Sequence, residues 1–286
     1  MRKAFYIFFI LFSVLLSSCR SWQPEGEEVL VVEGWIEEGA YPIVMVTTSV
    51  PTSTEYQSID EQRSHLVRWG KVSVSDGEKT VVLTGMQDKR FFPPYIYTCT
   101  GSNTIRGELG KAYSIKVEYS GDVVTGTTTV PAAVPLDSLW CEPSEKENGK
   151  YLIKARFSYP DNDDCFYRLL IKVEGKDSTY VPAYKGVVSE EFRGGKTVMS
   201  VQRGVSVENE VELFWNPVLF EEGERVCVKF CSMDRKSYEF WSTYDRMVSL
   251  ISVPLFPATY NPDYSLEGGI GYWCGYGAKE YKITVK

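Results

Sequence analysis

Hydrophobic and polar residues alternate along most of the chain in short runs, and a Pro- and Ala-rich segment, Pro131–Pro135, divides these runs into two groups. The runs are rich in Val, Ile, Thr and Tyr and are separated by Gly, Asp and Ser, a pattern typical of antiparallel strands joined by turns. We therefore predict a mostly β protein with two antiparallel β-sandwich domains, over residues 29–130 and 136–286, joined by a linker over residues 131–135. The spacing of the second group is typical of an immunoglobulin or fibronectin fold.

The alternation predicts a strand in each run. In the first region the predicted strands are Val29–Ile36, Ile43–Thr48, Lys71–Ser75, Thr80–Thr84, Tyr95–Thr100, Tyr113–Tyr119 and Val123–Val130. In the second they are Tyr151–Tyr159, Cys165–Glu174, Thr197–Gln202, Glu210–Trp215, Arg225–Met233 and Glu280–Val285.

Two segments have helical spacing instead. In Ser58–Trp69, apolar residues recur at near-helical intervals, which predicts a short helix crossing between strands of the first domain. A longer helix is expected over residues 235–252, where apolar residues recur every three or four positions. Asp234 is suited to cap its N-terminus, and Pro254 ends it. The tail that follows is rich in Gly and aromatic residues.

The N-terminus has the features of a lipoprotein signal over residues 1–18. Arg2 and Lys3 precede an apolar core of about a dozen residues, well short of the roughly 20 that a membrane span needs. The sequence Leu16-Ser-Ser-Cys19 matches the bacterial lipobox, so we expect acylated Cys19 to hold the protein in the lipid bilayer. Arg20 follows instead of an inner-membrane retention aspartate, which favours the outer membrane. Of the two faces of that membrane, the cell surface is favoured over the periplasmic face. Residues 19–28 form an acidic tether.

Composition bounds the function further. Cleavage of the signal removes Arg2 and Lys3 and moves the formal net charge from −7 to −9. An acidic protein without a basic cluster is not suited to binding nucleic acid. Six cysteines follow Cys19, and in an exported protein they either form disulfides or stay as buried thiols; they are Cys99, Cys141, Cys165, Cys227, Cys231 and Cys274. Cys227 and Cys231 would lie about 13 Å apart on one strand, too far to bond each other.

We expect no enzyme, metal or cofactor. His65 is the chain's one histidine, and its neighbour Ser64 would point to another face of a helix, so the two form no dyad. The C-x3-C spacing lacks the pairs of a zinc site, and Asp161–Asp164 lacks the glycine and glutamate of a calcium loop. The glycines of Gly268–Gly277 lack the βαβ context of a nucleotide site and instead let backbone pack closely against aromatic rings.

An aromatic cluster next to two prolines is the candidate interaction surface. Phe92, Tyr95 and Tyr97 belong to the run Phe91–Tyr97, and clustered rings on a surface often mark a binding site. The alternative is that Phe92 and Tyr95 close one end of the first sandwich.

Four motifs together resemble the lipoprotein family catalogued as domain of unknown function 4249. They are VVEGWI at Val31–Ile36, GKAYSIKVEY at Gly110–Tyr119, VPLDS at Val134–Ser138 and LEGGIGYWCGYG at Leu266–Gly277. The resemblance implies a transthyretin-like first sandwich and a role as an outer-membrane accessory of a TonB-dependent receptor in nutrient uptake. It brings no catalytic residues, and a disulfide at Cys274 would be particular to this protein. A structural or adhesive surface lipoprotein is the alternative function.

Overall fold

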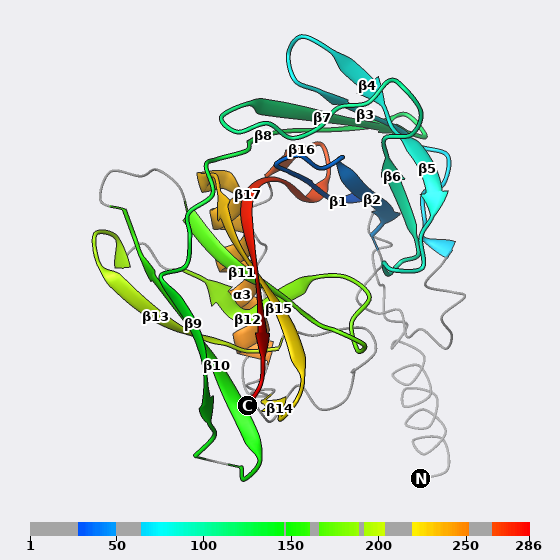
Figure 1. The fold of residues 1–286 in the computed structure, drawn as a ribbon. Helices are drawn as coiled ribbons and strands as arrows, with labels where there is room; N and C mark the ends of the chain where they lie inside the picture. The colour runs from blue at the N-terminus through cyan, green and yellow to red at the C-terminus, as the bar shows by residue number, and fades with distance from the viewer. Residues whose placement is uncertain are drawn as a thin grey trace, which may run out of the picture.

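The computed structural model describes residues 28–49, 64–145, 147–160, 166–188, 192–203, 219–251 and 265–286, and the side chains of α3 up to residue 246. Several predicted features lie outside these residues: the signal over 1–18, Cys19 and nearly all of the tether, Cys165, the run Asp161–Asp164 and the strand Glu210–Trp215. The described chain is mostly β, with three sheets and the helix α3 (Arg235–Ile251) (Figure 1).

An eight-stranded central sheet contains strands from both predicted regions. Its order is β12 (Val181–Val187), β11 (Phe166–Val173), β15 (Arg225–Met233), β17 (Ile270–Thr284), β1 (Leu30–Glu37), β2 (Ile43–Thr48), β6 (Tyr95–Thr98) and β5 (Thr84–Gln87). A five-stranded sheet has the order β16 (Leu266–Glu267), β8 (Asp122–Thr129), β7 (Ala112–Tyr119), β3 (Lys71–Ser75) and β4 (Thr80–Val82). In the third sheet β10 (Lys150–Ser158) pairs with β13 (Lys196–Val201), β14 (Phe220–Glu221) and β9 (Ser138–Pro143).

Strand β17 joins the two halves of the central sheet. It runs parallel to β1, with Val31 opposite Ile270, and antiparallel to β15, with Arg225 opposite Thr284. Only its last residues, from Glu280, were predicted as strand, because glycine weakens a strand. A Cβ on Gly275 or Gly277 would collide with the backbone of residues 129–133. These glycines therefore let the backbone of residues 129–133 cross directly over β17, so the close packing is against backbone rather than against aromatic rings.

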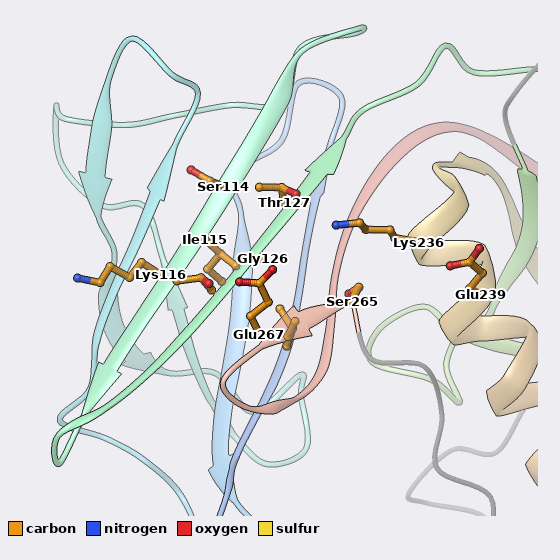
Figure 2. Close-up of a pocket in the computed structure, with 11 residues that line it drawn as sticks. Ser114, Ile115, Lys116, Gly126, Thr127, Lys236, Glu239, Ser265 and Glu267 are labelled. Carbon is orange, nitrogen blue, oxygen red and sulfur yellow. The ribbon is translucent and has the colours of Figure 1, made fainter.

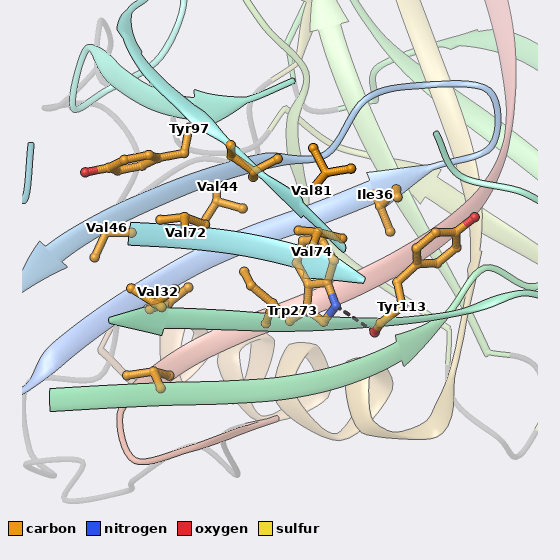
Figure 3. Packing of buried hydrophobic residues seen from close by; sticks show 14 of the residues in the cluster. Val32, Ile36, Val44, Val46, Val72, Val74, Val81, Tyr97, Tyr113 and Trp273 are labelled. Carbon is orange, nitrogen blue, oxygen red and sulfur yellow. Dashed lines mark hydrogen bonds between the residues drawn. The ribbon is translucent and has the colours of Figure 1, made fainter. Parts of the chain in front are cut away.

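Two apolar cores lie on the same side of the central sheet. The first lies between the β1–β2–β6 part of the sheet and the five-stranded sheet (Figure 3). Trp273 is fully buried there, and its Nε1–H donates to the carbonyl oxygen of Tyr113 at 3.0 Å. The second core lies between β11 and β15 and the sheet of β10 and β13.

The other side of the central sheet carries α3. Arg235–Ile251 confirms the helix predicted over 235–252, and Asp234 is its N-cap, since Oδ1 accepts from the Ser237 amide at 2.9 Å. Asp234 Oδ2 accepts from Thr128 Oγ1 at 2.8 Å and from the Thr129 amide at 3.1 Å. The cap thus also ties the start of the helix to β8.

The helix predicted over Ser58–Trp69 is wrong from Leu66 onward, and residues 58–63 lie outside the described part. Leu66 forms a β-bridge with Thr47, and the Val67 amide donates to Val46 at 3.0 Å. The end of β2 that extends beyond its pairing with β6 pairs with this segment, so its backbone groups bond to a strand instead of continuing a helix. Among the described elements α3 is the only helix.

The predicted strand Thr80–Thr84 is divided at Leu83. Residues Thr80–Val82 belong to the five-stranded sheet, whereas Thr84–Gln87 belong to the central sheet. Leu83 is buried in the first core, so the chain passes from one sheet to the other around this side chain. None of the described helices has the length and apolar character needed to cross a membrane.

Candidate functional site

A cleft of about 600 Å³ lies on the side of the central sheet that carries α3. Side chains alternate between the two faces of a strand. In the central sheet, one set of alternate residues is buried in the two apolar cores, and the other set faces α3 and the cleft. Its floor is formed by Trp35 on β1, Leu170 on β11, Lys229 on β15 and Tyr272 on β17, and α3 forms a wall with Trp241 and neighbouring rings.

Two loops meet at the rim of the cleft. Ser178 Oγ donates to the carbonyl oxygen of Arg90 at 2.8 Å, and Lys172 Nζ donates to that of Ser178 at 3.1 Å. The loop before β6 contributes Phe91 and Phe92 to the lining. The β11–β12 loop contributes Tyr180, so contact between the loops fixes aromatic residues on this side.

Aromatic rings dominate the lining. Trp35 and Phe91 lie 6.0 Å apart between ring centroids, and Trp241 and Tyr272 lie 4.7 Å apart. Trp241 Nε1–H donates to Tyr276 Oη at 2.9 Å, so the polar atom of this indole has a partner. Burial raises the pKa of the Tyr272 and Tyr276 phenols, which are therefore neutral at physiological pH.

A buried ion pair lies on the floor. Lys229 Nζ donates to the two carboxylate oxygens of Glu37 at 2.8 and 3.0 Å, and Glu280 lies 3.4 Å away. Lys229 Nζ also lies 4.4 Å from the centroid of the Tyr180 ring. Desolvation lowers the pKa of Lys229, but Glu37, Cys231 and Glu280 together outweigh it, and the net pKa is raised. Lys229 is therefore charged at neutral pH, and its ammonium is hydrogen-bonded to Glu37.

Arg168 on β11 has a different environment. The residue is 1 % exposed, and its guanidinium carbon lies 3.5 Å from the centroid of the Trp241 ring. Its Nε and Nη1 atoms are buried and have no hydrogen-bond partner among the described residues. Such donors cost free energy when buried, and in native proteins they are uncommon.

Glu33 on β1 is the second charged group without a close partner in the described part of the cleft. No described ion pair or hydrogen bond engages its carboxyl, and desolvation by burial raises its pKa. Glu33 lies opposite Tyr272 in the pairing of β1 with β17 and lines the cleft with Tyr244, and its charge raises the pKa of both phenols. Glu33 can thus accept a cation or, when protonated, donate a hydrogen bond.

The predicted interaction surface is only partly at the surface. Phe92 is 42 % exposed and lines the cleft, whereas Tyr95 is half-buried against the first core. Tyr97 is buried, so its assignment to a surface is wrong: strand alternation points this ring inward, and its Oη donates to Val67 at 2.8 Å. Desolvation raises the pKa of Tyr97 to about 12.

The five described cysteines are free thiols. Cys99, Cys227, Cys231 and Cys274 are buried, and Cys141 is partly buried. Cys227 and Cys231 lie on the extended strand β15, as predicted. Burial raises the pKa of Cys274 to about 11, so this thiol is not a nucleophile at neutral pH.

Sequence reasoning missed Glu33, Arg168 and Lys229. The signal was present, since Arg168 and Lys229 interrupt nearly continuous apolar runs, FYRLLIKV and RVCVKFCSM. Charged residues are rarely buried without a reason. Which face of the sheet these side chains share could not be read before the strand order was known.

A second hollow of about 440 Å³ lies between β7, β8 and the start of α3 (Figure 2). Its described lining includes Lys116, Thr127, Lys236, Glu239 and Ser265 and contains no aromatic ring. It offers hydrogen bonds but no surface for stacking, so the aromatic cleft is the stronger candidate. Among the described residues no cluster of His, Cys, Asp or Glu could hold a metal ion. His65 Nδ1 lies 2.9 Å from Thr48 Oγ1 and contributes to packing beside β2.

The profile of a protein family described as "Domain of unknown function (DUF4249)" matches residues 22–282. This match confirms the resemblance drawn from the four motifs, and it includes every residue that lines the cleft. No curated protein matches the chain.

Proposed function

We propose that this chain, which belongs to the DUF4249 family, is a non-enzymatic binding lipoprotein that holds a small molecule in the aromatic cleft. The observation that carries the proposal is the cleft itself, with its volume of about 600 Å³ and its aromatic walls. Ligand sites are typically concave, mostly apolar and about 300–1,000 Å³ in volume, with a few polar groups that orient the ligand. Arg168, Glu33 and the Lys229–Glu37 pair are such groups.

The proposal places this binding protein on the outer membrane, beside a TonB-dependent receptor in nutrient uptake. The lipobox at Leu16–Cys19 supports the anchor, and the family resemblance supports the receptor. The cleft would then present a captured nutrient to the receptor.

We also infer that the chain consists of two β-sandwich domains that share the central sheet. Two separate cores support this division, one facing the five-stranded sheet and one facing the sheet of β10 and β13. The linker at 131–135 lies where one core gives way to the other.

The anchor can be tested with the Cys19→Ser variant. Serine has no sulfur to receive a diacylglycerol, so we expect complete loss of acyl labelling and release from the membrane or a block in maturation. The measurement is metabolic labelling with a palmitate analogue, followed by membrane fractionation. Cys141→Ser is the control, since it removes a thiol from the folded part. An unlabelled Cys19→Ser protein that stays on the membrane would contradict lipid anchoring.

The receptor can be tested with Phe92→Ala. An exposed ring at a binding surface contributes about 1–2 kcal/mol, so we expect about 5- to 30-fold weaker recovery of a TonB-dependent receptor and an unchanged melting temperature. The measurement is a pull-down of native lipoprotein from detergent-solubilised outer membranes. Val82→Ala is the control, because Val82 is exposed on β4, away from the cleft. Recovery of adhesive surface proteins instead of a receptor would favour the structural alternative.

A further inference from the structure

Arg168 holds two donors in the wall of the cleft that the described protein does not use. Its planar face lies against Trp241, at 3.5 Å from the ring centroid. Stacking engages the face of a guanidinium, whereas its N–H groups lie in the plane of the group and point outward from its edge. Stacking therefore does not satisfy these N–H groups, and Nε and Nη1 have no acceptor among the described residues.

The neighbouring carboxylates do not supply those acceptors. Asp245 on α3 accepts the amide of Val187 at 3.1 Å, and its charge interacts with Arg168 without a hydrogen bond to Nε or Nη1. The carboxylate of Glu37 already accepts hydrogen bonds from Lys229 Nζ. Nε and Nη1 lie on different edges of the guanidinium, so each is suited to donate one charge-assisted hydrogen bond to an oxygen of a bound carboxylate.

Glu33 offers the opposite charge within the same group of rings. Glu33 lies opposite Tyr272 in the pairing of β1 with β17, and Trp241, on which Arg168 stacks, lies 4.7 Å from the Tyr272 ring between centroids. The two groups thus lie beside the same pair of rings, Trp241 and Tyr272. A carboxylate beside aromatic faces is suited to an ammonium group, since the rings attract cations as well.

We propose that the cleft binds a small zwitterion with an apolar body, an amino acid or a short peptide, whose carboxylate is held by Arg168 and whose ammonium is held by Glu33. The aromatic walls, including Trp35 and Trp241, take the apolar side chains. This inference rests on the proposed function, because it names the ligand class of the same cleft. The volume of about 600 Å³ accommodates a dipeptide-sized molecule.

The test uses four forms of one dipeptide: leucylphenylalanine, its C-terminal amide, its N-acetyl derivative and the doubly blocked form. Isothermal titration calorimetry measures the Kd of each for the full mature chain. We expect the zwitterion to bind at least about 10-fold more tightly than either singly blocked form. Arg168→Met should abolish the preference for the free carboxylate and keep that for the free amine, and Glu33→Gln should do the converse.

Arg156→Met is the matched control. Arg156 also stacks on a tryptophan, with its guanidinium carbon 5.5 Å from the Trp140 ring centroid, but it lies outside the cleft. This variant should keep both preferences. If Arg168→Met fails to fold, the four ligand forms on the wild type and on Glu33→Gln still decide the result.

Two outcomes would overturn the assignment. Equal affinity for all four forms would show that the cleft binds the apolar side chains and does not recognise the charged termini. That result leaves the proposed binding function intact. Failure of every form to bind at millimolar concentration would exclude this ligand class. Receptor recovery in the pull-down then reports on the proposed function separately.

Discussion

The Trp273→Ala variant is expected to lose about 3–5 kcal/mol of unfolding free energy. Trp273 is fully buried in the first core, where its ring packs beneath Gly34 of β1. Truncation leaves a cavity that this close-packed site cannot fill. It also removes the donor to the Tyr113 carbonyl at 3.0 Å and leaves a buried acceptor unpaired.

Urea denaturation followed by circular dichroism measures the loss. Trp69→Ala is the matched control, since Trp69 is 90 % exposed and its truncation should change the unfolding free energy by less than about 0.5 kcal/mol. Similar midpoints for the two variants would mean that Trp273 does not anchor the contact between the central and five-stranded sheets.

The Lys229→Met variant is expected to lose about 2–4 kcal/mol, because removing one partner of a buried ion pair leaves the other charge uncompensated. Lys229 contacts both oxygens of Glu37 and lies 3.4 Å from Glu280. Without the Lys229 ammonium, the carboxylates of Glu37 and Glu280 repel each other beside the apolar floor. The measurement is the unfolding free energy at pH 7.

The double variant Lys229→Met, Glu37→Gln provides the control. Neutralising Glu37 removes the stranded charge, so much of the lost stability should return. Lys116→Met is a second control, since Lys116 pairs with Glu118 at 2.8 Å on the exposed face of β7, where ion pairs contribute little. A Lys229→Met protein as stable as Lys116→Met would show that the floor is well hydrated.

Local pattern predicted the elements well where a single rule governed them. Ile43–Thr48, Lys71–Ser75 and Arg225–Met233 have the predicted bounds, because alternation or a continuous apolar run reports burial directly. The helix at Arg235–Ile251 followed from its apolar spacing and the cap at Asp234. These signals depend only on neighbours along the chain.

Prediction failed where a partner distant in sequence decided the conformation. Leu66 was assigned to a helix but pairs with Thr47, and Gly271–Ala278 were not assigned to a strand although β17 contains them. The gain from pairing β17 with both β1 and β15 outweighs the weak strand preference of glycine, and no local pattern reports it.

By itself the sequence determined a mostly β chain, the α3 helix and membership of the DUF4249 family. Only the tertiary structure decided that Glu33, Arg168 and Lys229 share one cleft, because that depends on the order of β11, β15, β17 and β1 in the central sheet. Alternation along a strand fixes which residues share a face of that strand, but strand order fixes which faces meet. Strand order is set by long-range pairing, and for that reason the cleft could not be predicted.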